Sequence, residues 1–325
     1  VATATTTPSG PRRYGQAVIA CSVIVPARDA AATIGAALDG LARQQTAHEF
    51  EVIVVDDGSR DATAAIAAGS RIAPRVLEQP AAGPAVARNR GARGARAGVL
   101  AFLDADCVPS PGWLDAGLAA MQGADLVQGA VHADPQAPAG PFDRTLWVTS
   151  QSPLFESANL FVQRALFERL EGFESWLRPV GGKELGEDVV FGWSARRAGA
   201  RTAFSAQALV HHAVFPRRVG GYIAERARLR HFPAIAGRVP ELRRCFFYRR
   251  IFLTRRSAAF DLALLGAAAS PRRPLALAAG IPYVAQVARD LRVRGAKVAA
   301  VEVVADAVGL YALARGSVSA RTAVL

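Results

Sequence analysis

The sequence predicts an α/β fold in which a mostly parallel central sheet is flanked by helices and followed by a helical C-terminal extension. In the first half, β-branched apolar segments alternate with segments of helical periodicity. These strand segments are apolar throughout, as is typical of strands covered on both faces by helices. Polar residues directly follow three of them. With 325 residues, of which 51% are hydrophobic, the chain is long enough for one large domain with an appendage.

The first half is expected to contain four strands and three helices. The predicted strands are Val18 to Val25, Phe50 to Val55, Arg75 to Glu78 and Val99 to Leu103. The predicted helices are Thr33 to Gln44, Asp61 to Ala68 and Ala85 to Ala97. Asp61 is expected to be the N-cap of its helix, because aspartate oxygens accept hydrogen bonds from free backbone N–H groups.

The second half is less regular. The segments with a recognisable pattern are a strand at Leu126 to Val131, an apolar stretch at Glu156 to Val162, helices at Arg164 to Arg169 and Val189 to Ala198, and short strands at Thr202 to Phe204 and Ala208 to His211. From Tyr222 onward the pattern is helical and basic. We therefore expect a tail at 1–17, a catalytic domain at 18–216 and a basic helical region at 217–325.

Charge and composition bear on location and partners. The net charge is +12, and basic residues are dense from Arg217 to Arg256, which fits either a solvated face or contact with a polyanion. The apolar runs Ala258 to Ala269 and Leu275 to Ala288 are shorter than the ~20 residues of a spanning helix, so core helices and a hairpin on a bilayer both remain open. Val1 to Gly15 lacks the apolar core of a secretion signal, and the three cysteines lack paired spacing. We therefore expect a cytoplasmic protein, without a disulfide framework or zinc site.

Three predicted strands end in polar residues: Arg28-Asp29, Asp56-Asp57 and Asp104-Ala105-Asp106. Ligands of open α/β sheets bind at the carboxyl ends of the strands, so this edge predicts a nucleotide site. Carboxylate oxygens suit Mg²⁺ or Mn²⁺. The alternative is a strand-terminating Asx turn.

An ordered series of motifs extends from Ser22 to Phe215. Its segments are Ser22-Val-Ile-Val-Pro-Ala-Arg28, Glu51-Val-Ile-Val-Val-Asp-Asp-Gly-Ser-Arg-Asp61, Ala87-Arg-Asn-Arg-Gly91, Leu100-Ala-Phe-Leu-Asp-Ala-Asp106, Glu156-Ser-Ala-Asn-Leu-Phe161, Gly172-Phe173 and Gly186-Glu-Asp-Val-Val-Phe-Gly192. The series resembles the family 2 glycosyltransferases. The resemblance implies the GT-A fold, in which a nucleotide-diphosphate sugar binds at the strand ends.

The resemblance also implies roles for individual residues. Those implied to line the nucleotide-sugar site are Pro26, Ala27, Arg28, Asp57, Arg88, Asp104, Ala105 and Asn159. Asp57 would contact the base, and Asn159 would wall the donor sugar. The implied metal ligands are Asp104, Asp106 and a histidine, for which His212 fits the pattern better than His211. A packed strand-end histidine is the alternative.

Asp188 matches the catalytic base of the inverting members of the family. A carboxylate within hydrogen-bond reach can take the proton of an attacking acceptor hydroxyl. Glu187 could orient the acceptor. The alternative is that Glu187 and Asp188 only stabilise the N-terminus of a helix through its dipole.

We therefore expect an inverting, Mg²⁺- or Mn²⁺-dependent transfer of a sugar from a nucleotide-diphosphate donor to an acceptor hydroxyl. UDP-sugars are favoured, although guanine and thymine donors remain open. The acceptor class is carbohydrate or lipid-linked, as in cell-envelope polysaccharide or glycolipid synthesis. A retaining transferase and a non-catalytic sugar-nucleotide-binding protein are the alternatives, and no nucleic-acid partner is expected. Docking of residues 217–325 on the anionic cytoplasmic face of a membrane is a further hypothesis.

Overall fold

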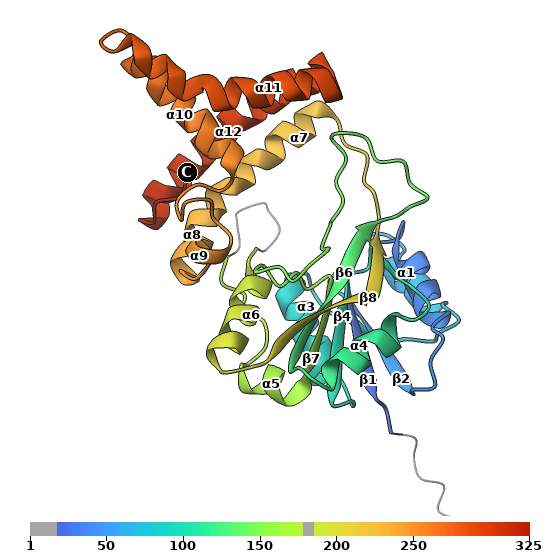
Figure 1. Ribbon diagram of the computed structural model, residues 1–325. Coiled ribbons are helices and arrows are strands. Elements are labelled where there is room, and N and C mark those ends of the chain that lie inside the picture. The colour runs from blue at the N-terminus through green and yellow to red at the C-terminus, as the bar shows by residue number, and fades with distance from the viewer. Residues whose placement is uncertain (1–17, 178–184) are drawn as a thin grey trace, which may run out of the picture.

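The computed structural model describes residues 18–177 and 185–325, which form an α/β domain followed by a helical region (Figure 1). The tail expected at 1–17 lies outside the described residues. The strands are β1 Cys21–Ala27, β2 Phe50–Asp56, β3 Arg75–Glu78, β4 Val99–Leu103, β5 Cys107–Pro109, β6 Leu126–Ala133, β7 Asn159–Gln163 and β8 Thr202–His212. They form one sheet in the order β3-β2-β1-β4-β7-β6-β8-β5.

Six of these strands run in the same direction. β2 and β4 pair in parallel with β1, and β3 pairs in parallel with β2. β7 is antiparallel to both β4 and β6, so β6 and its parallel partner β8 regain the direction of β4. β5 returns antiparallel to β8. The prediction of a mostly parallel sheet flanked by helices is confirmed.

Helices cover both faces of the sheet and create two hydrophobic cores. The helices of this domain are α1 Ile34–Ala42, α2 Thr63–Ala68, α3 Pro84–Arg93, α4 Trp113–Met121, α5 Arg164–Arg169 and α6 Glu187–Arg197. One core contains Ile24 and Phe102, and the other contains Val23 and Phe161, because successive side chains of a strand face opposite sides. Helix α4 was not predicted. It lies close to the sheet because Gly117 leaves room for the Phe161 ring.

Two local predictions in the first half were wrong by a few residues. Val18 is 87% exposed, and β1 begins only at Cys21, where both faces become covered. Asp61 is not an N-cap, because α2 begins at Thr63 after Ala62. The Asp61 carboxylate instead accepts hydrogen bonds from the backbone N–H groups of Thr63 and Ala31, both at 3.0 Å. It thereby ties the loop after β1 to the start of α2.

The two short strands predicted at 202–204 and 208–211 are one strand with a bulge. Along β8 the register with β6 jumps from Gly129 opposite Ser205 to Ala130 opposite Leu209. The bulge is held by a hydrogen bond of 3.2 Å from the Ala208 N–H to the Ser205 hydroxyl. A bulge interrupts the period-2 pattern of a strand, which explains why the sequence suggests two strands.

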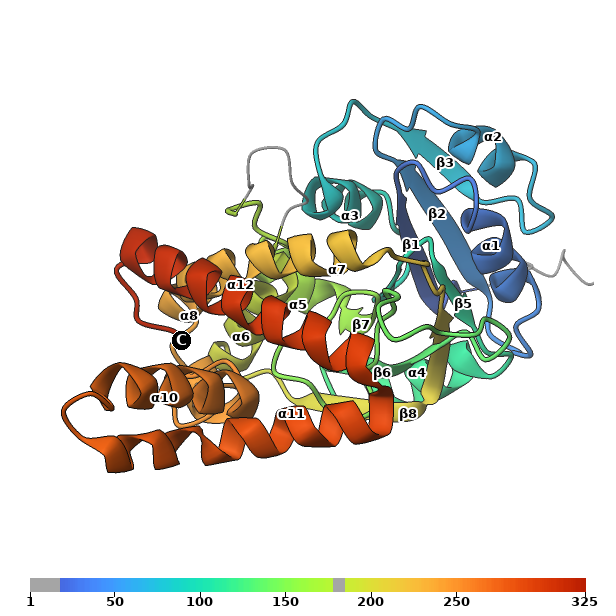
Figure 2. The same cartoon turned by 90° about the horizontal axis from the view of Figure 1, so that it is seen from above.

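The helical C-terminal extension expected from the sequence is present. Its elements are α7 Val219–Arg226, η1 Ala227–His231, α8 Phe232–Arg238, α9 Leu242–Cys245, α10 Arg255–Ala269, η2 Pro274–Gly280, α11 Ile281–Arg294 and α12 Ala296–Ala320. The long helix α12 packs against α7, η1, α8 and α11. Figure 2 shows these helices over the part of the domain that contains β6, β7 and α6, beside the β1–β3 end of the sheet. Within residues 18–177 and 185–325, no helix has the length and apolarity needed to cross a membrane.

Candidate active site

A tight turn separates the two carboxylates that follow β4. The Cys107 N–H donates to the Asp104 carbonyl at 3.0 Å, so the chain reverses between β4 and β5. After this turn, the Asp104 carboxylate contacts α3 and the Asp106 carboxylate lies near the end of β8. Ala105, between them, is buried. The chain therefore turns directly after β4, and the turn directs the two side chains to different partners.

Arg88 connects the acidic turn with the start of α6. Its Nη2 donates to Asp104 at 2.8 Å, and its Nη1 donates to Glu187 at 3.1 Å. The Arg88 side chain is only 6% exposed. Burial lowers the pKa of Arg88, but the charges of Asp104 and Glu187 outweigh burial and shift it upward, so the guanidinium stays charged. Arg88 and Glu187, which are 99 residues apart in the sequence, thus meet at one site.

Asp188 lies at the start of α6, directly after Glu187. Its carboxylate accepts hydrogen bonds from the Val189 N–H at 2.8 Å and from the Ser157 N–H at 3.4 Å. Burial raises the pKa of Asp188 well above its usual range, the charge of Glu187 adds to this, and Arg88 opposes it. A carboxylate of raised pKa is a stronger proton acceptor than an ordinary surface aspartate. Asp188 therefore has the chemistry of a general base.

The position of α6 depends on the residue before it. Gly186 has a left-handed backbone with φ of 76°, which other residues adopt only with strain. A Cβ atom at this position would come within 3.2 Å of the Ile235 side chain from α8. The C-terminal region thus packs directly on the segment that carries Glu187 and Asp188.

Asp106 and His212 form the second part of the site. The His212 Nε2 lies 3.6 Å from an Asp106 carboxylate oxygen, and Cys107 is close to both residues. The His212 Nδ1 lies 2.6 Å from the Ala213 carbonyl, which can only accept a hydrogen bond. In a neutral ring the proton is therefore on Nδ1, and the bare Nε2 lone pair lies close to the carboxylate. Asp106 and His212 thus offer a carboxylate oxygen and a ring nitrogen, a set of donors that a divalent metal can use.

The side chains beside Asp106 and His212 bear on the kind of metal that this pair would suit. The Cys107 Sγ is within 3.9 Å of Asp106, and burial raises the pKa of this thiol well above its usual range. Carboxylate and imidazole together suit Mn²⁺, whereas thiolate selects softer metals. Among the described residues, the buried Nδ1 of His211 has no hydrogen-bond partner. The ligand roles of Asp104, Asp106 and His212 stay predictions.

Asp57 and the end of β1 lie at the same edge of the sheet. The Asp57 carboxylate accepts hydrogen bonds from Gln79 at 2.7 Å, the Ala82 N–H at 2.7 Å and the Gly83 N–H at 2.8 Å. It thereby fixes the loop that leads into α3. Its own N–H donates to the Ala27 carbonyl at 2.8 Å.

If Asp57 contacts the nucleotide base as predicted, its carboxylate must accept that hydrogen bond in addition to those from Gln79, Ala82 and Gly83. Pro26 is next to Ala27 on the same strand, at the register position opposite Val55 of β2. Arg28 is exposed and lies 3.9 Å from Asp29, a separation and exposure at which an ion pair contributes little stability.

Asn159 does not take the position expected for a residue that walls the donor sugar. Its side chain is fully buried and donates to the Ala130 and Ala208 carbonyls at 2.9 and 2.7 Å. Its Oδ1 accepts from the Trp113 indole at 2.8 Å. These three hydrogen bonds leave the amide no free donor. Asn159 instead fixes the bulge of β8, the strand that ends at His212.

Two contacts of the site were missed by sequence reasoning. The Gln79 amide bonds Asp57, and the Thr145 hydroxyl lies 3.3 Å from the His212 Nδ1. Gln79 lies next to the end of a short strand and Thr145 lies in a long irregular loop, so neither has a spacing signal. Only the fold brings them to the site.

Comparison with known proteins supports the resemblance. The family described as Glycosyl transferase family 2 matches residues 22–171. A glycosyltransferase AglE of Haloferax volcanii is 36% identical over 118 residues, which are 34% of this chain and 39% of that protein. A validoxylamine A glucosyltransferase of Streptomyces hygroscopicus is 40% identical over 126 residues, 36% of this chain and 30% of that protein. A pre-mycofactocin glycosyltransferase of Mycobacterium tuberculosis is 30% identical over 63% of this chain and 44% of that protein. The chain thus spans less than half the length of these curated relatives.

Solved structures show a similar fold. The mannosyltransferase PcManGT from Pyrobaculum calidifontis, in complex with GDP-Man and Mn²⁺, has a TM-score of 0.61 at 21% identity, with coverage of 91% of this chain and 86% of that chain. S. aureus TarS 1-349 in complex with UDP has a TM-score of 0.50 at 19% identity, with coverage of 92% and 91%. The sheet with its flanking helices, the helical extension and the family match agree with one another. The chain therefore has the GT-A fold, and its residues 22–171 match glycosyltransferase family 2.

Proposed function

We propose that this protein is an inverting, metal-dependent glycosyltransferase that uses a nucleotide-diphosphate sugar. The observation that carries the proposal is the double ion pair of Arg88, because it brings the acidic turn after β4 next to the start of α6. In this proposal the acidic turn belongs to the donor site, the start of α6 activates the acceptor, and Arg88 holds the two next to each other. Both PcManGT and TarS are described in complex with nucleotides or nucleotide sugars, which supports this donor class.

In the proposed reaction, Asp188 accepts the proton of the acceptor hydroxyl as its oxygen attacks the anomeric carbon. The raised pKa of Asp188 favours this transfer. Glu187 is already paired with the buried Arg88, so its part is to position α6 and Arg88. Asp106 and His212 would hold Mn²⁺ or Mg²⁺, and Asp104 would remain on the Arg88 side. A bound cation supplies positive charge that stabilises the departing diphosphate.

Substitution of the proposed base tests the mechanism. Asp188→Asn keeps the shape of the side chain but removes its basicity, so sugar transfer should fall about 10²- to 10⁴-fold while donor binding is retained. Asp39→Asn, at an exposed aspartate that pairs with the exposed Arg71, is the control. If Asp188→Asn transfers sugar at the wild-type rate, Asp188 is not the base. Inversion of the anomeric centre in the product, followed by NMR, separates the proposal from a retaining reaction.

The donor base is open, since TarS was solved with UDP and PcManGT with GDP-Man. We favour UDP-sugars. Thermal shifts with a panel of UDP-, GDP- and TDP-sugars in the presence of Mn²⁺ test this, because a ligand that binds only the native state raises its stability. Stabilisation by GDP-sugars alone would contradict the preference for UDP. No stabilisation by any donor would support a different activity.

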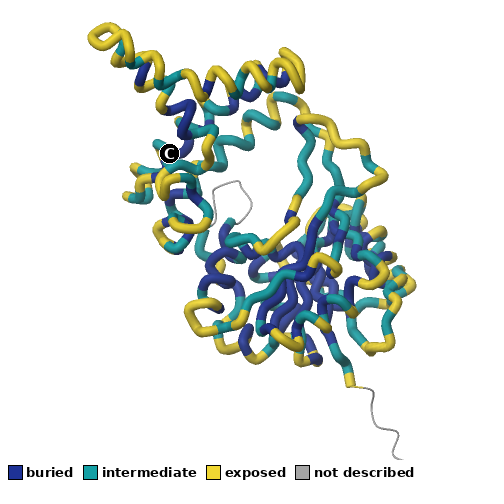
Figure 3. The backbone as a smooth tube through the Cα atoms, in the orientation of Figure 1, coloured by how far each residue is buried: buried dark blue, intermediate teal, exposed yellow. Residues whose placement is uncertain are grey.

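We also propose that the hairpin formed by α10, η2 and α11 docks on an anionic membrane. At its tip, Leu275 is 91% exposed, and Leu265 and Leu277 are also exposed. Figure 3 shows this exposed tip projecting from the body of the protein. Arg272 and Arg273 lie beside the leucines, and basic residues next to an apolar tip favour anionic lipid headgroups.

Liposome co-sedimentation tests the membrane proposal. The double substitution of Leu275 and Leu277 by Ser should reduce binding to anionic vesicles, while Val318→Ser, at an exposed position of α12, should not. Equal sedimentation of all variants, or binding only to neutral vesicles, would contradict docking through this tip. An acceptor in the cell envelope would be reached from such a membrane surface, and is proposed on that ground.

A further inference from the structure

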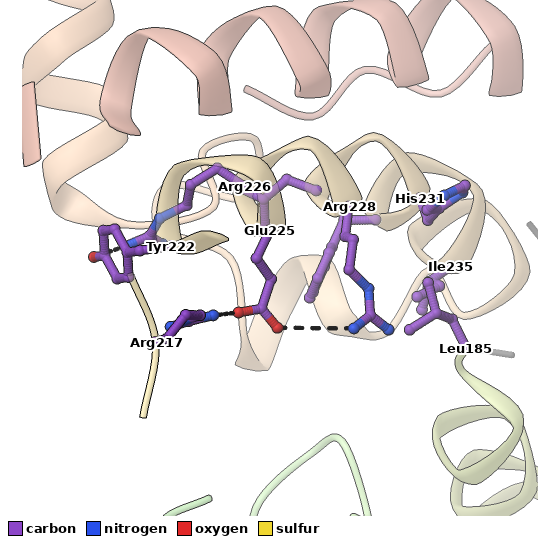
Figure 4. A pocket seen from close by; sticks show the side chains of 10 residues that line it. Leu185, Arg217, Tyr222, Glu225, Arg226, Arg228, His231 and Ile235 are labelled. Carbon is purple, nitrogen blue, oxygen red and sulfur yellow. Dashed lines mark hydrogen bonds and ion pairs between the residues drawn. The ribbon is translucent and has the colours of Figure 1, made fainter. Parts of the chain in front are cut away.

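A cavity of about 350 Å³ lies in the C-terminal region, outside the acidic site. Its size is within the range typical of small-molecule sites. The walls come from the segment before α7, from α7, η1 and α8, and from Leu185 (Figure 4). The lining combines apolar Leu229, Phe232 and Ile235 with basic Arg217, Arg226 and Arg228.

The cavity has more positive than negative charge. Glu225 is the carboxylate among the described lining residues, and both Arg217 and Arg228 are paired with it. Figure 4 shows Glu225 between these two guanidinium groups. Burial lowers the pKa of Arg228, and the charge of the nearby Arg144 lowers it further. Several guanidinium groups around one carboxylate form an attractive site for a further anion.

The apolar part of the lining lies next to the catalytic segment. Ile235 of α8 is packed against Gly186, the residue before α6. Leu185, which also lines the cavity, is two residues before Glu187. A molecule in this cavity would therefore lie beside the end of α6 that carries the proposed base Asp188.

We propose that this cavity binds the acceptor through a phosphate ester that carries an apolar substituent. The phosphate would contact Arg217 and Arg228, since guanidinium groups match phosphate oxygens in pairs. The substituent would pack on Leu229, Phe232 and Ile235. The inference rests on the proposed function, because it assigns the cavity to the acceptor of the Asp188-catalysed transfer.

Binding of octyl phosphate to the full chain, followed by calorimetry in the absence of donor, tests the proposal. Octyl glucoside has the chain without the charge, and glycerol phosphate has the charge without the chain. We expect octyl phosphate to bind at least about tenfold more tightly than either. Arg228→Gln should weaken octyl phosphate binding about tenfold, because it removes a charged hydrogen-bond donor. Glu225→Gln should strengthen binding, because it removes the competing carboxylate.

Arg230→Gln is the matched control, since Arg230 is an exposed arginine on the same η1 element. Equal weakening by Arg228→Gln and Arg230→Gln would overturn the proposal in favour of diffuse attraction. Equal affinity for glycerol phosphate and octyl phosphate, or no binding of octyl phosphate, would also overturn it. Hydrolysis of the nucleotide-sugar donor by the same variants distinguishes the cavity proposal from the proposed transferase activity. Loss of octyl phosphate binding with intact hydrolysis rejects only the cavity, while intact binding without any hydrolysis or transfer rejects the proposed activity.

Discussion

Replacement of Arg88 by Met should destabilise the protein strongly, because it leaves two carboxylates without their partner. Glu187 is buried, and its hydrogen bond from Arg88 is 3.1 Å long, while Asp104 is held at 2.8 Å. Breaking a buried ion pair by removing one partner costs about 3–5 kcal/mol. With an unfolding entropy of about 2.1 cal/mol/K per residue, this cost corresponds to a loss of about 4–7 °C in Tm for a chain of 325 residues.

Thermal and urea unfolding of three variants test this reasoning. Arg93→Met removes an exposed arginine from the last turn of the same helix and should change stability by less than about 0.5 kcal/mol. Combining Arg88→Met with Glu187→Gln should recover part of the loss, since the second substitution neutralises the carboxylate left buried. Wild-type stability of Arg88→Met, or no recovery in the double variant, would refute the view that Arg88 holds the two segments together.

Three further outcomes follow from other parts of the structure. Burial and the charge of Asp306 raise the pKa of Asp261 from 3.8 to about 6, so ionisation of Asp261 opposes folding, and stability should fall as the pH rises from about 4 to above 6. Asp261→Asn should remove this fall in unfolding experiments at pH 4 and 8. His212→Ala should weaken Mn²⁺ binding about tenfold or more in a titration without donor, and unchanged affinity would exclude His212 as a ligand. Asn159→Ala should lower the unfolding free energy by more than about 1 kcal/mol, because it leaves the Ala130 and Ala208 carbonyls unpaired. An unchanged midpoint of urea unfolding would show that the bulge does not need this amide.

The fold of the first half was predictable because its signals are local. Strands β1, β2 and β4 each contain an apolar run followed by polar residues, and both features are visible within ten residues. The acidic turn after β4 and the glutamate-aspartate pair at the start of α6 belong to the same class of signal. Element boundaries were wrong where the pattern does not show burial or distant contacts: Val18 is exposed ahead of β1, and Asp61 bonds Ala31 instead of capping α2.

The arrangement around the site was not predictable in the same way. Which carboxylate pairs with Arg88 depends on the packing of α3 against α6, and which histidine lies near Asp106 depends on the register of β5 and β8. Asn159 shows the limit most clearly. Its motif position suggests contact with a sugar, but the bulge in β8 consumes its amide donors. Nothing in the spacing of the sequence reveals that bulge.

The charge balance of the site argues for catalysis over a purely structural role. Asp104, Glu187 and Asp188 lie around the buried guanidinium of Arg88, and Asp106 lies on the other side of the turn, beside His212. Burial and the negative charge of Glu187 oppose ionisation of Asp188. This group of carboxylates therefore makes the fold less stable than apolar residues at the same positions would. Such conflicts between local chemistry and stability are typical of functional sites. A phosphate-bearing donor would add further negative charge, and the cation that we propose for Asp106 and His212 would offset it.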